Sequence, residues 1–225
     1  MPRKQSQAFE DVQEPDEDAV FRRLAELGIP PEAVRESVRG GYQRGDFVTD
    51  SHPVNYQGMV VWGEITGAFR GRMIDAGWAK NDDDCVPRIV SPDGRVVVVP
   101  VRGNSKTGVR NAHEQLSTRR PRGRAGVRIV RVNTQYALQL EERGREMDFV
   151  PALDGTWFLL YNRDEDIVRM EVSYAKAISA SGALLEWVER LILPDLDLLD
   201  FPTDRRRRND GTPPEVDFVV TRRAS

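Results

Sequence analysis

The first pattern along the chain is helical, with apolar residues at three- and four-residue spacing over residues 16–45. Asp16 or Asp18 can cap the first helix of this segment, because an aspartate side chain accepts hydrogen bonds from the free backbone N–H groups of a helix start. The pair Pro30-Pro31 can then open a second helix, where proline loses no helical hydrogen bond. The pattern predicts an N-terminal helical hairpin.

A longer amphipathic pattern covers residues 55–76 and predicts one long central helix. Its apolar face consists of Val61, Trp62, Ile65, Phe69, Met73 and Ala76. Of these, Trp62, Ile65, Phe69 and Met73 are expected to be core. Glycines recur within it every four or five residues, and each costs up to about 1 kcal/mol relative to alanine in a helix. They are Gly58, Gly63, Gly67 and Gly71. This cost predicts that the glycine face packs closely against a second element.

Two antiparallel hairpins are predicted further along the chain. The first joins residues 89–90 to residues 95–101 through Ser91-Pro92-Asp93-Gly94, a favourable turn sequence. Its second strand contains the unbroken valine run 96–99, which is typical of a strand buried on both faces. The second hairpin joins an apolar strand at 157–161 to an alternating strand at 168–174. The predicted fold class is therefore α+β, with the central helix packed on these antiparallel hairpins.

Two further segments and the chain ends complete the predicted organisation. Residues 126–132 alternate apolar side chains with arginines, which predicts a half-exposed strand. The period of residues 184–193 fits a helix or a strand. We expect a single α+β domain over residues 16–203, between a disordered acidic tail at 1–15 and a polar tail at 204–225.

The chain has 225 residues and a formal net charge of −3, but its charges are unevenly placed. Residues 102–131 hold nine basic residues and one acid, so this segment carries +8 and the rest of the chain −11. Acidic residues gather at 10–18, 82–84 and 195–204. A separation of this size creates a strong field, which either folds on itself or attracts an anionic partner.

Composition narrows the class of protein. No apolar run is long enough to span a membrane, and the N-terminus lacks the apolar stretch of a secretory signal, so we expect a cytoplasmic location and no membrane partner. The single cysteine, Cys85, excludes a disulfide framework within the chain and a cysteine-rich zinc site. We expect Cys85 to be a small buried side chain.

The basic segment is the leading candidate for function. Six of its arginines are candidate nucleic-acid contacts: Arg119, Arg120, Arg122, Arg124, Arg128 and Arg131. Arginine forms bidentate hydrogen bonds with phosphate groups. No aromatic residue is interleaved with them, so the segment predicts contact with the backbone of nucleic acid and not stacking on its bases. The alternative is that the protein's own acids neutralise these arginines.

Two other possible functions belong to different classes. Glu64, Asp93 and Lys106 resemble the layout of restriction-type nucleases, in which acids hold a divalent metal and a lysine lies near the attacking water. Asn104 stands where that layout expects an acid before the lysine, which would weaken metal binding or leave the site degenerate. Apart from this divalent metal, no cofactor is expected. The other possibility is a protein-binding adaptor that docks partners through its opposite charge poles.

Part of the predicted helical hairpin resembles a DNA-binding motif. Residues 28–38 resemble the turn and second helix of a bacterial helix-turn-helix motif. Leu24 is bulkier than the small residue usual upstream of that turn, and Glu32 and Glu36 would repel a phosphate backbone. An ordinary helical hairpin is the favoured interpretation.

Three segments together resemble a set of bacterial proteins that spans most of this length: residues 27–32, 62–78 and 186–194. No activity is attached to that set, so the resemblance transfers no site residue. It implies a bacterial origin. The leading interpretation is a bacterial cytosolic accessory or regulatory binding protein that contacts nucleic acid non-specifically through residues 102–131.

Overall fold

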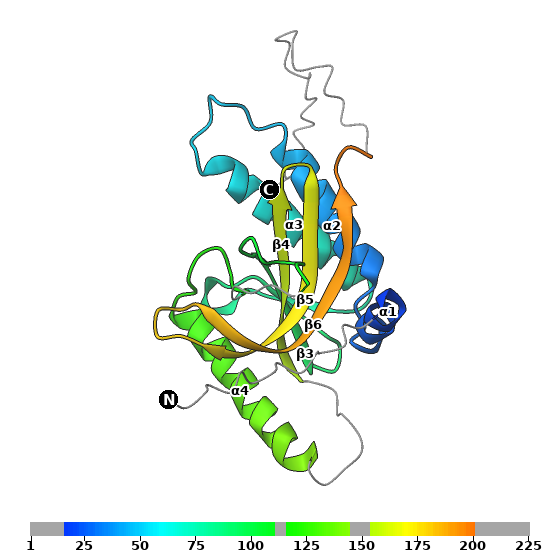
Figure 1. Cartoon of the computed structure of the whole chain (residues 1–225), viewed down its shortest axis with the longest axis vertical. Coiled ribbons are helices and arrows are strands. Elements are labelled where there is room, and N and C mark those ends of the chain that lie inside the picture. The colour runs from blue at the N-terminus through cyan, green and yellow to red at the C-terminus, as the bar shows by residue number, and fades with distance from the viewer. Residues whose placement is uncertain (1–15, 111–115, 145–153, 201–225) are drawn as a thin grey trace, which may run out of the picture.

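The computed structural model describes residues 16–110, 116–144 and 154–200, which form an α+β fold. The helices are α1 (Glu17–Glu26), α2 (Pro31–Gly45), α3 (Tyr56–Asp75) and α4 (Arg124–Gly144), with a short 3₁₀ helix at Asp83–Cys85. The strands are β1 (Ala79–Asn81), β2 (Arg88–Val90), β3 (Val96–Arg102), β4 (Gly155–Asp164), β5 (Ile167–Ile178) and β6 (Leu184–Asp197). They form one mixed sheet in the order β1-β2-β3-β4-β5-β6. Figure 1 labels β3 to β6 of this sheet. Among the strands of the described residues, β3 and β4 alone pair in parallel, and α4 lies between these two strands in sequence.

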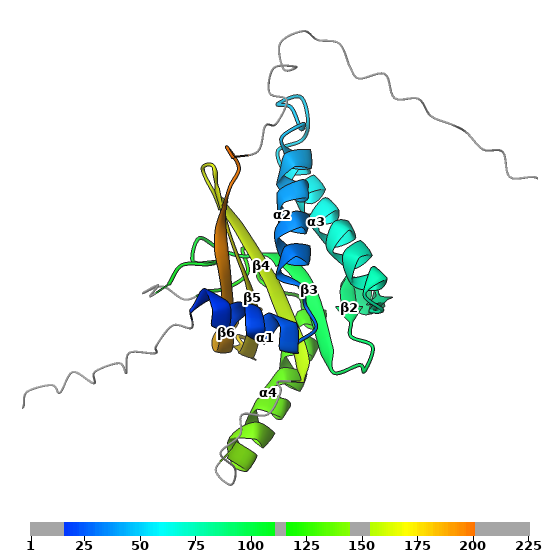
Figure 2. The same cartoon turned by 90° about the vertical axis from the view of Figure 1, so that its right-hand side faces the viewer.

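Helices cover both faces of this sheet (Figure 2). Helices α1, α2 and α3 pack on the face to which Trp157, Leu159 and Tyr161 of β4 point. Helix α4 packs on the opposite face, against Phe158 and Leu160 of the same strand. All five of these side chains are fully buried. Strand β4 is thus covered on both sides, which explains its unbroken apolar sequence.

Most of the predicted elements are confirmed. Asp16 caps α1, and its Oδ1 accepts a hydrogen bond of 2.7 Å from the backbone N–H of Glu17. The central helix is α3, and Phe69 on its inner face is fully buried. Both hairpins form, as β2–β3 and β4–β5, and Val98 and Val99 are buried on opposite faces of the sheet. The undecided segment 184–193 is part of strand β6.

Three predictions, one about a segment and two about single residues, are wrong. Residues 126–132 lie in helix α4 and not in a strand, because the parallel pair β3 and β4 needs a crossover connection between its two members. Trp62 was expected in the core, but it is 41% exposed on α3. The thiol of Cys85 was expected to be buried and is exposed, at the end of the 3₁₀ helix.

The close packing expected at the glycines of α3 is also absent from the described part of the chain. A Cβ atom added at Gly63, Gly67 or Gly71 would have no heavy atom within 4 Å. The close approach occurs on α2 instead, where a Cβ at Gly41 would overlap Cγ1 of Ile65. The contact between α2 and α3 therefore depends on a small residue in α2 and not on those in α3.

The predicted tails at residues 1–15 and 204–225 lie outside the described residues. Within the residues that the structure describes, no helix has both the length and the apolar character that a bilayer-spanning segment needs. The face of the sheet covered by α4 carries most of the basic segment, which follows β3 in sequence.

Candidate nucleic-acid interface

The basic segment begins with a loop that a buried carboxylate holds on the sheet. Glu171 of β5 is fully buried, and its Oε1 accepts a hydrogen bond of 2.8 Å from the backbone N–H of Gly108. Arg190 of β6 donates to both carboxylate oxygens, at 2.8 Å from Nε and 3.0 Å from Nη2. The hydroxyl of Ser173 donates to Oε2 at 2.7 Å. These donors occupy both oxygens of the buried carboxylate, which in turn holds the loop at Gly108 against β5.

The segment then turns back along the end of β3 and approaches α4. The backbone N–H of Arg119 donates to the carbonyl of Arg102 at 2.9 Å. The backbone N–H of Arg122 donates to the carbonyl of Gly182, in the turn between β5 and β6, at 2.6 Å. Gly182 has a φ of +88°, and a Cβ atom there would overlap the backbone of Arg122, so this contact requires glycine.

Helix α4 presents three arginines on one side. Arg124, Arg128 and Arg131 are separated by four and three residues, which places them along one face of a helix, and all three are exposed. The opposite side is attached to the sheet. Val130 is fully buried there, and Nδ2 of Asn133 donates to carbonyls of β4 and β5 at 2.7 and 3.1 Å. The sheet thus orients α4 so that its arginines face outward.

Four exposed arginines form no ion pair or side-chain hydrogen bond within residues 16–110, 116–144 and 154–200: Arg119, Arg120, Arg124 and Arg131. Arg128 differs, because its Nη2 lies 2.5 Å from Oδ1 of Asp84. Arg122 is half-buried, and burial lowers the pKa of its guanidinium group. Four of the six predicted contact residues therefore offer an unpaired charge at the surface.

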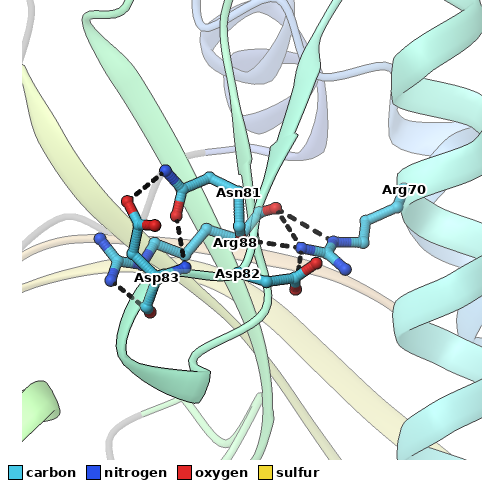
Figure 3. A network of polar contacts seen from close by, with 5 residues as sticks. All are labelled: Arg70, Asn81, Asp82, Asp83 and Arg88. Atoms are coloured by element: carbon cyan, nitrogen blue, oxygen red, sulfur yellow. Dashed lines mark hydrogen bonds and ion pairs between the residues drawn. The ribbon is translucent and has the colours of Figure 1, made fainter.

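The acidic residues at 82–84 are exposed and form contacts with the protein's own residues, two of which are drawn in Figure 3 as Asp82 and Asp83. Nη2 of Arg70 on α3 lies 2.6 Å from Oδ1 of Asp82, and Nε of Arg70 donates to the carbonyl of Arg88 at 3.0 Å. Nδ2 of Asn81 donates to Asp83 at 2.8 Å. This network ties α3 to strands β1 and β2, so these acids have a structural role. No three His, Cys, Asp or Glu side chains in the described ranges are grouped so as to hold a metal.

Asp93, a member of the nuclease trio, serves the turn before β3. Its Oδ1 accepts hydrogen bonds from the hydroxyl of Ser91 at 2.5 Å and from the backbone N–H of Arg95 at 3.1 Å. These hydrogen bonds, chiefly the one from Ser91, lower the pKa of the fully exposed Asp93 carboxyl. The turn that the sequence predicts therefore accounts for this residue.

Neither Glu64 nor Lys106 lies near that turn. Lys106 follows the opposite end of β3, and a strand of this length spans roughly 20 Å. The turn meets the chain at Gly77, just beyond α3, whereas Glu64 is exposed roughly 20 Å back along the helix axis. Carboxylates that bind one Mg²⁺ at about 2.1 Å must lie far closer together. The structure does not bring these three residues into one site.

Helix α2 has little free surface for reading DNA. Val34 and Val38 are buried, as in the packing of a helix-turn-helix, but most of the remaining surface of α2 is covered as well. Helix α3 covers one side at Gly41, and on another side Nη1 of Arg35 donates to the carbonyl of Pro194 in β6 at 3.0 Å. A recognition helix needs an open face to enter the major groove. The motif resemblance therefore reflects an ordinary helical packing unit.

Comparison of the chain with protein-family models, with curated proteins and with solved structures found no match. The arginines are apparent in the sequence, whereas the groups that position them, above all Glu171 and Arg190, are not. The sequence contains a signal for Glu171, which sits on the polar face of an alternating strand, but nothing local indicates that the basic loop covers that face.

Proposed function

We propose that the protein is an accessory or regulatory binding protein of the bacterial cytoplasm that contacts nucleic acid through its phosphate backbone, without reading base sequence. The observation that carries this proposal is the set of four exposed arginines without an ionic partner within the described residues: Arg119, Arg120, Arg124 and Arg131. They follow one another within a short stretch of chain that is attached to the sheet at both ends of its course.

The chemistry of these groups fits phosphate oxygens. Each guanidinium group presents a planar set of donors that matches two phosphate oxygens, and it stays charged at every physiological pH. Phosphate contacts of this kind release condensed counterions, so four of them give a slope of log K against log salt of about −3.6 on duplex DNA. Contacts with the backbone position a protein without specifying sequence.

The test is binding of a labelled generic duplex, measured by fluorescence anisotropy as a function of salt. The wild-type chain should bind at about 50 mM salt and weaken steeply as salt rises. A variant with alanine at Arg119, Arg120, Arg124 and Arg131 should lose most of that salt dependence. Two unrelated duplex sequences should be affected about equally.

A matched control separates a local interface from a general effect of charge. Alanine at Arg22, Arg44, Arg72 and Lys80 removes the same number of exposed positive charges from α1, α2, α3 and β1. This variant should bind like the wild type. Equal weakening in both variants, or no binding of the wild type at about 50 mM salt, would end the proposal.

A further inference from the structure

A second group of cationic and hydroxyl side chains lies on the other face of the sheet, where β3 and β4 meet α2 and α3. Arg102 of β3 and Tyr161 of β4 are neighbours in the parallel register and point to the same face as Trp157. The ring of Tyr42, from α2, lies edge-on to that of Tyr161 at 6.2 Å between ring centres. Nη1 of Arg102 reaches the first turn of α3, 3.9 Å from the position of a Cβ atom on Gly58.

Polar groups in this place are buried without a hydrogen-bond partner in the described structure. They are the hydroxyl of Tyr161, which is fully buried, the hydroxyl of Tyr42, whose residue is 5% exposed, and Nε of Arg102. Such orphaned groups are few in native proteins, because each one sacrifices its hydration without replacement. Three of them lie close together, so an acceptor from outside the described residues would satisfy them at one place. Because the described residues enclose all three groups, such an acceptor reaches them when neighbouring side chains move apart.

The electrostatics of the site favour an anion as that missing group. Arg163 lies 6.0 Å from the centre of the Tyr42 ring, and its Nη1 pairs with Asp46 at 2.8 Å. Nη2 of Arg163 also lies 3.6 Å from Oδ1 of Asp166. Arg102 and Arg119 lie close enough to act on the Tyr42 hydroxyl, so three cations lie at the site against two carboxylates, both of which pair with Arg163. The site also faces the start of α3, where the helix dipole is positive, and the first turn of α3 contains no acidic residue.

Both tyrosines act as neutral donors here. Burial raises the pKa of Tyr42 to about 12, against the opposing effect of the nearby arginines. Burial likewise raises the pKa of Tyr161. Their O–H groups therefore stay protonated at neutral pH and can donate to an oxyanion. Arg102, Gly58 and Arg163 are only partly buried, so the cluster borders solvent.

We infer that Tyr42, Tyr161 and Arg102 form a binding site for a phosphate-type oxyanion, either free phosphate or the phosphate monoester of a small molecule. The two hydroxyls and the guanidinium group supply the donors, and the start of α3 adds its positive dipole. Tetrahedral phosphate oxygens can accept from several directions at once, which suits donors that arrive from α2, β3 and β4. This inference is tested separately from the nucleic-acid proposal, because Tyr42, Tyr161 and Arg102 are not among the four arginines substituted there. Of those four arginines, Arg119 also acts on the Tyr42 hydroxyl.

The experiment measures the melting temperature of the full chain with inorganic phosphate and with chloride at the same ionic strength. At phosphate concentrations about 100-fold above its Kd, the wild-type melting temperature should rise by roughly 5–10 °C relative to chloride. Tyr161→Phe and Tyr42→Phe should lose most of this rise. In chloride the same variants should melt no lower than the wild type, because each substitution removes an orphaned hydroxyl.

Tyr56→Phe is the matched control, since Tyr56 is an exposed tyrosine in the same first turn of α3. It should keep the full response to phosphate. A wild-type chain whose melting temperature is the same in phosphate and chloride, or an equal rise in all variants, would overturn the inference. A nucleoside 5′-monophosphate added in place of phosphate distinguishes the sources: a larger rise, lost in Tyr161→Phe, identifies a monoester, and an equal rise identifies free phosphate.

Discussion

Gly41→Ala and Gly67→Ala add the same methyl group to adjacent helices and should change stability in opposite directions. At Gly67 the new Cβ has no heavy atom within 4 Å, so the substitution gains helix propensity of about 0.5–1 kcal/mol. At Gly41 the Cβ overlaps Cγ1 of Ile65 and lies 3.0 Å from the carbonyl oxygen of Val61 and 3.1 Å from the backbone nitrogen of Ile65. Two of these atoms are backbone, so α2 and α3 must move apart.

Both variants gain the same helix propensity. The difference between their free energies of unfolding therefore isolates the cost of moving α2 and α3 apart. Overpacking in a close contact costs about 1–3 kcal/mol, and each kcal/mol corresponds to roughly 2–4 °C in melting temperature for a domain of this size. Urea denaturation followed by tryptophan fluorescence measures the free energy of unfolding of each variant, because Trp157 is fully buried in the core beneath these helices.

Equal stability of the two variants would refute the reasoning about the contact between α2 and α3. Destabilisation by Gly67→Ala would refute a different step, the assumption that the outer face of α3 is uncovered.

Two further substitutions test the contacts that hold the basic segment and the turn before β3. Arg190→Met should destabilise the fold by about 3–5 kcal/mol in chemical denaturation, because it leaves the carboxylate of Glu171 buried without its cation, and Arg190→Lys should recover part of the loss. Asp93→Asn tests a pH effect: hydrogen bonds hold the folded pKa of Asp93 below its ordinary value of 3.8, so its stabilising contribution is present above that pH and is lost as the pH falls through the folded pKa. The stabilities of wild type and variant should therefore converge between neutral pH and about pH 2, and a constant gap would contradict the assignment.

Local patterns predicted the elements that depend on local contacts. The turn at 91–94 and the valines of β3 specify a hairpin within a few residues, and the cap at Asp16 specifies the start of α1. Residues 126–132 were misassigned because Val127-Arg128-Ile129 and Val130-Arg131-Val132 each alternate as in a strand. The alternation breaks between Ile129 and Val130, and the spacing of Arg124, Arg128 and Arg131 is helical. The parallel pairing of β3 with β4 requires a helix there, and that pairing joins residues more than fifty positions apart.

Local sequence patterns likewise reveal the residues of the candidate sites only where those residues are adjacent in the chain. The arginines of the basic segment were found because they are adjacent in sequence, and four of them are exposed as expected. Arg102 belongs to the same charged segment but points to the other face of the sheet, which only the alternation along β3 reveals. Tyr42 and Tyr161 come from elements far apart in the chain, and each fits an apolar pattern, so nothing in the sequence separates them from ordinary core residues.

Both proposed anion contacts arise from the single parallel pair in the sheet. Because β3 and β4 run in the same direction, their carboxyl ends meet at one edge, and Arg102, Tyr161 and Arg163 occupy the last residues of these two strands. The carboxyl ends of parallel strands are where ligands commonly bind in α/β sheets. The parallel arrangement also requires a long connection across the opposite face, and that connection carries the exposed arginines of the basic segment and α4. An antiparallel pairing of β3 and β4 would require neither a shared carboxyl-end edge nor a long crossover connection. The basic segment seen in the sequence therefore corresponds largely to this crossover.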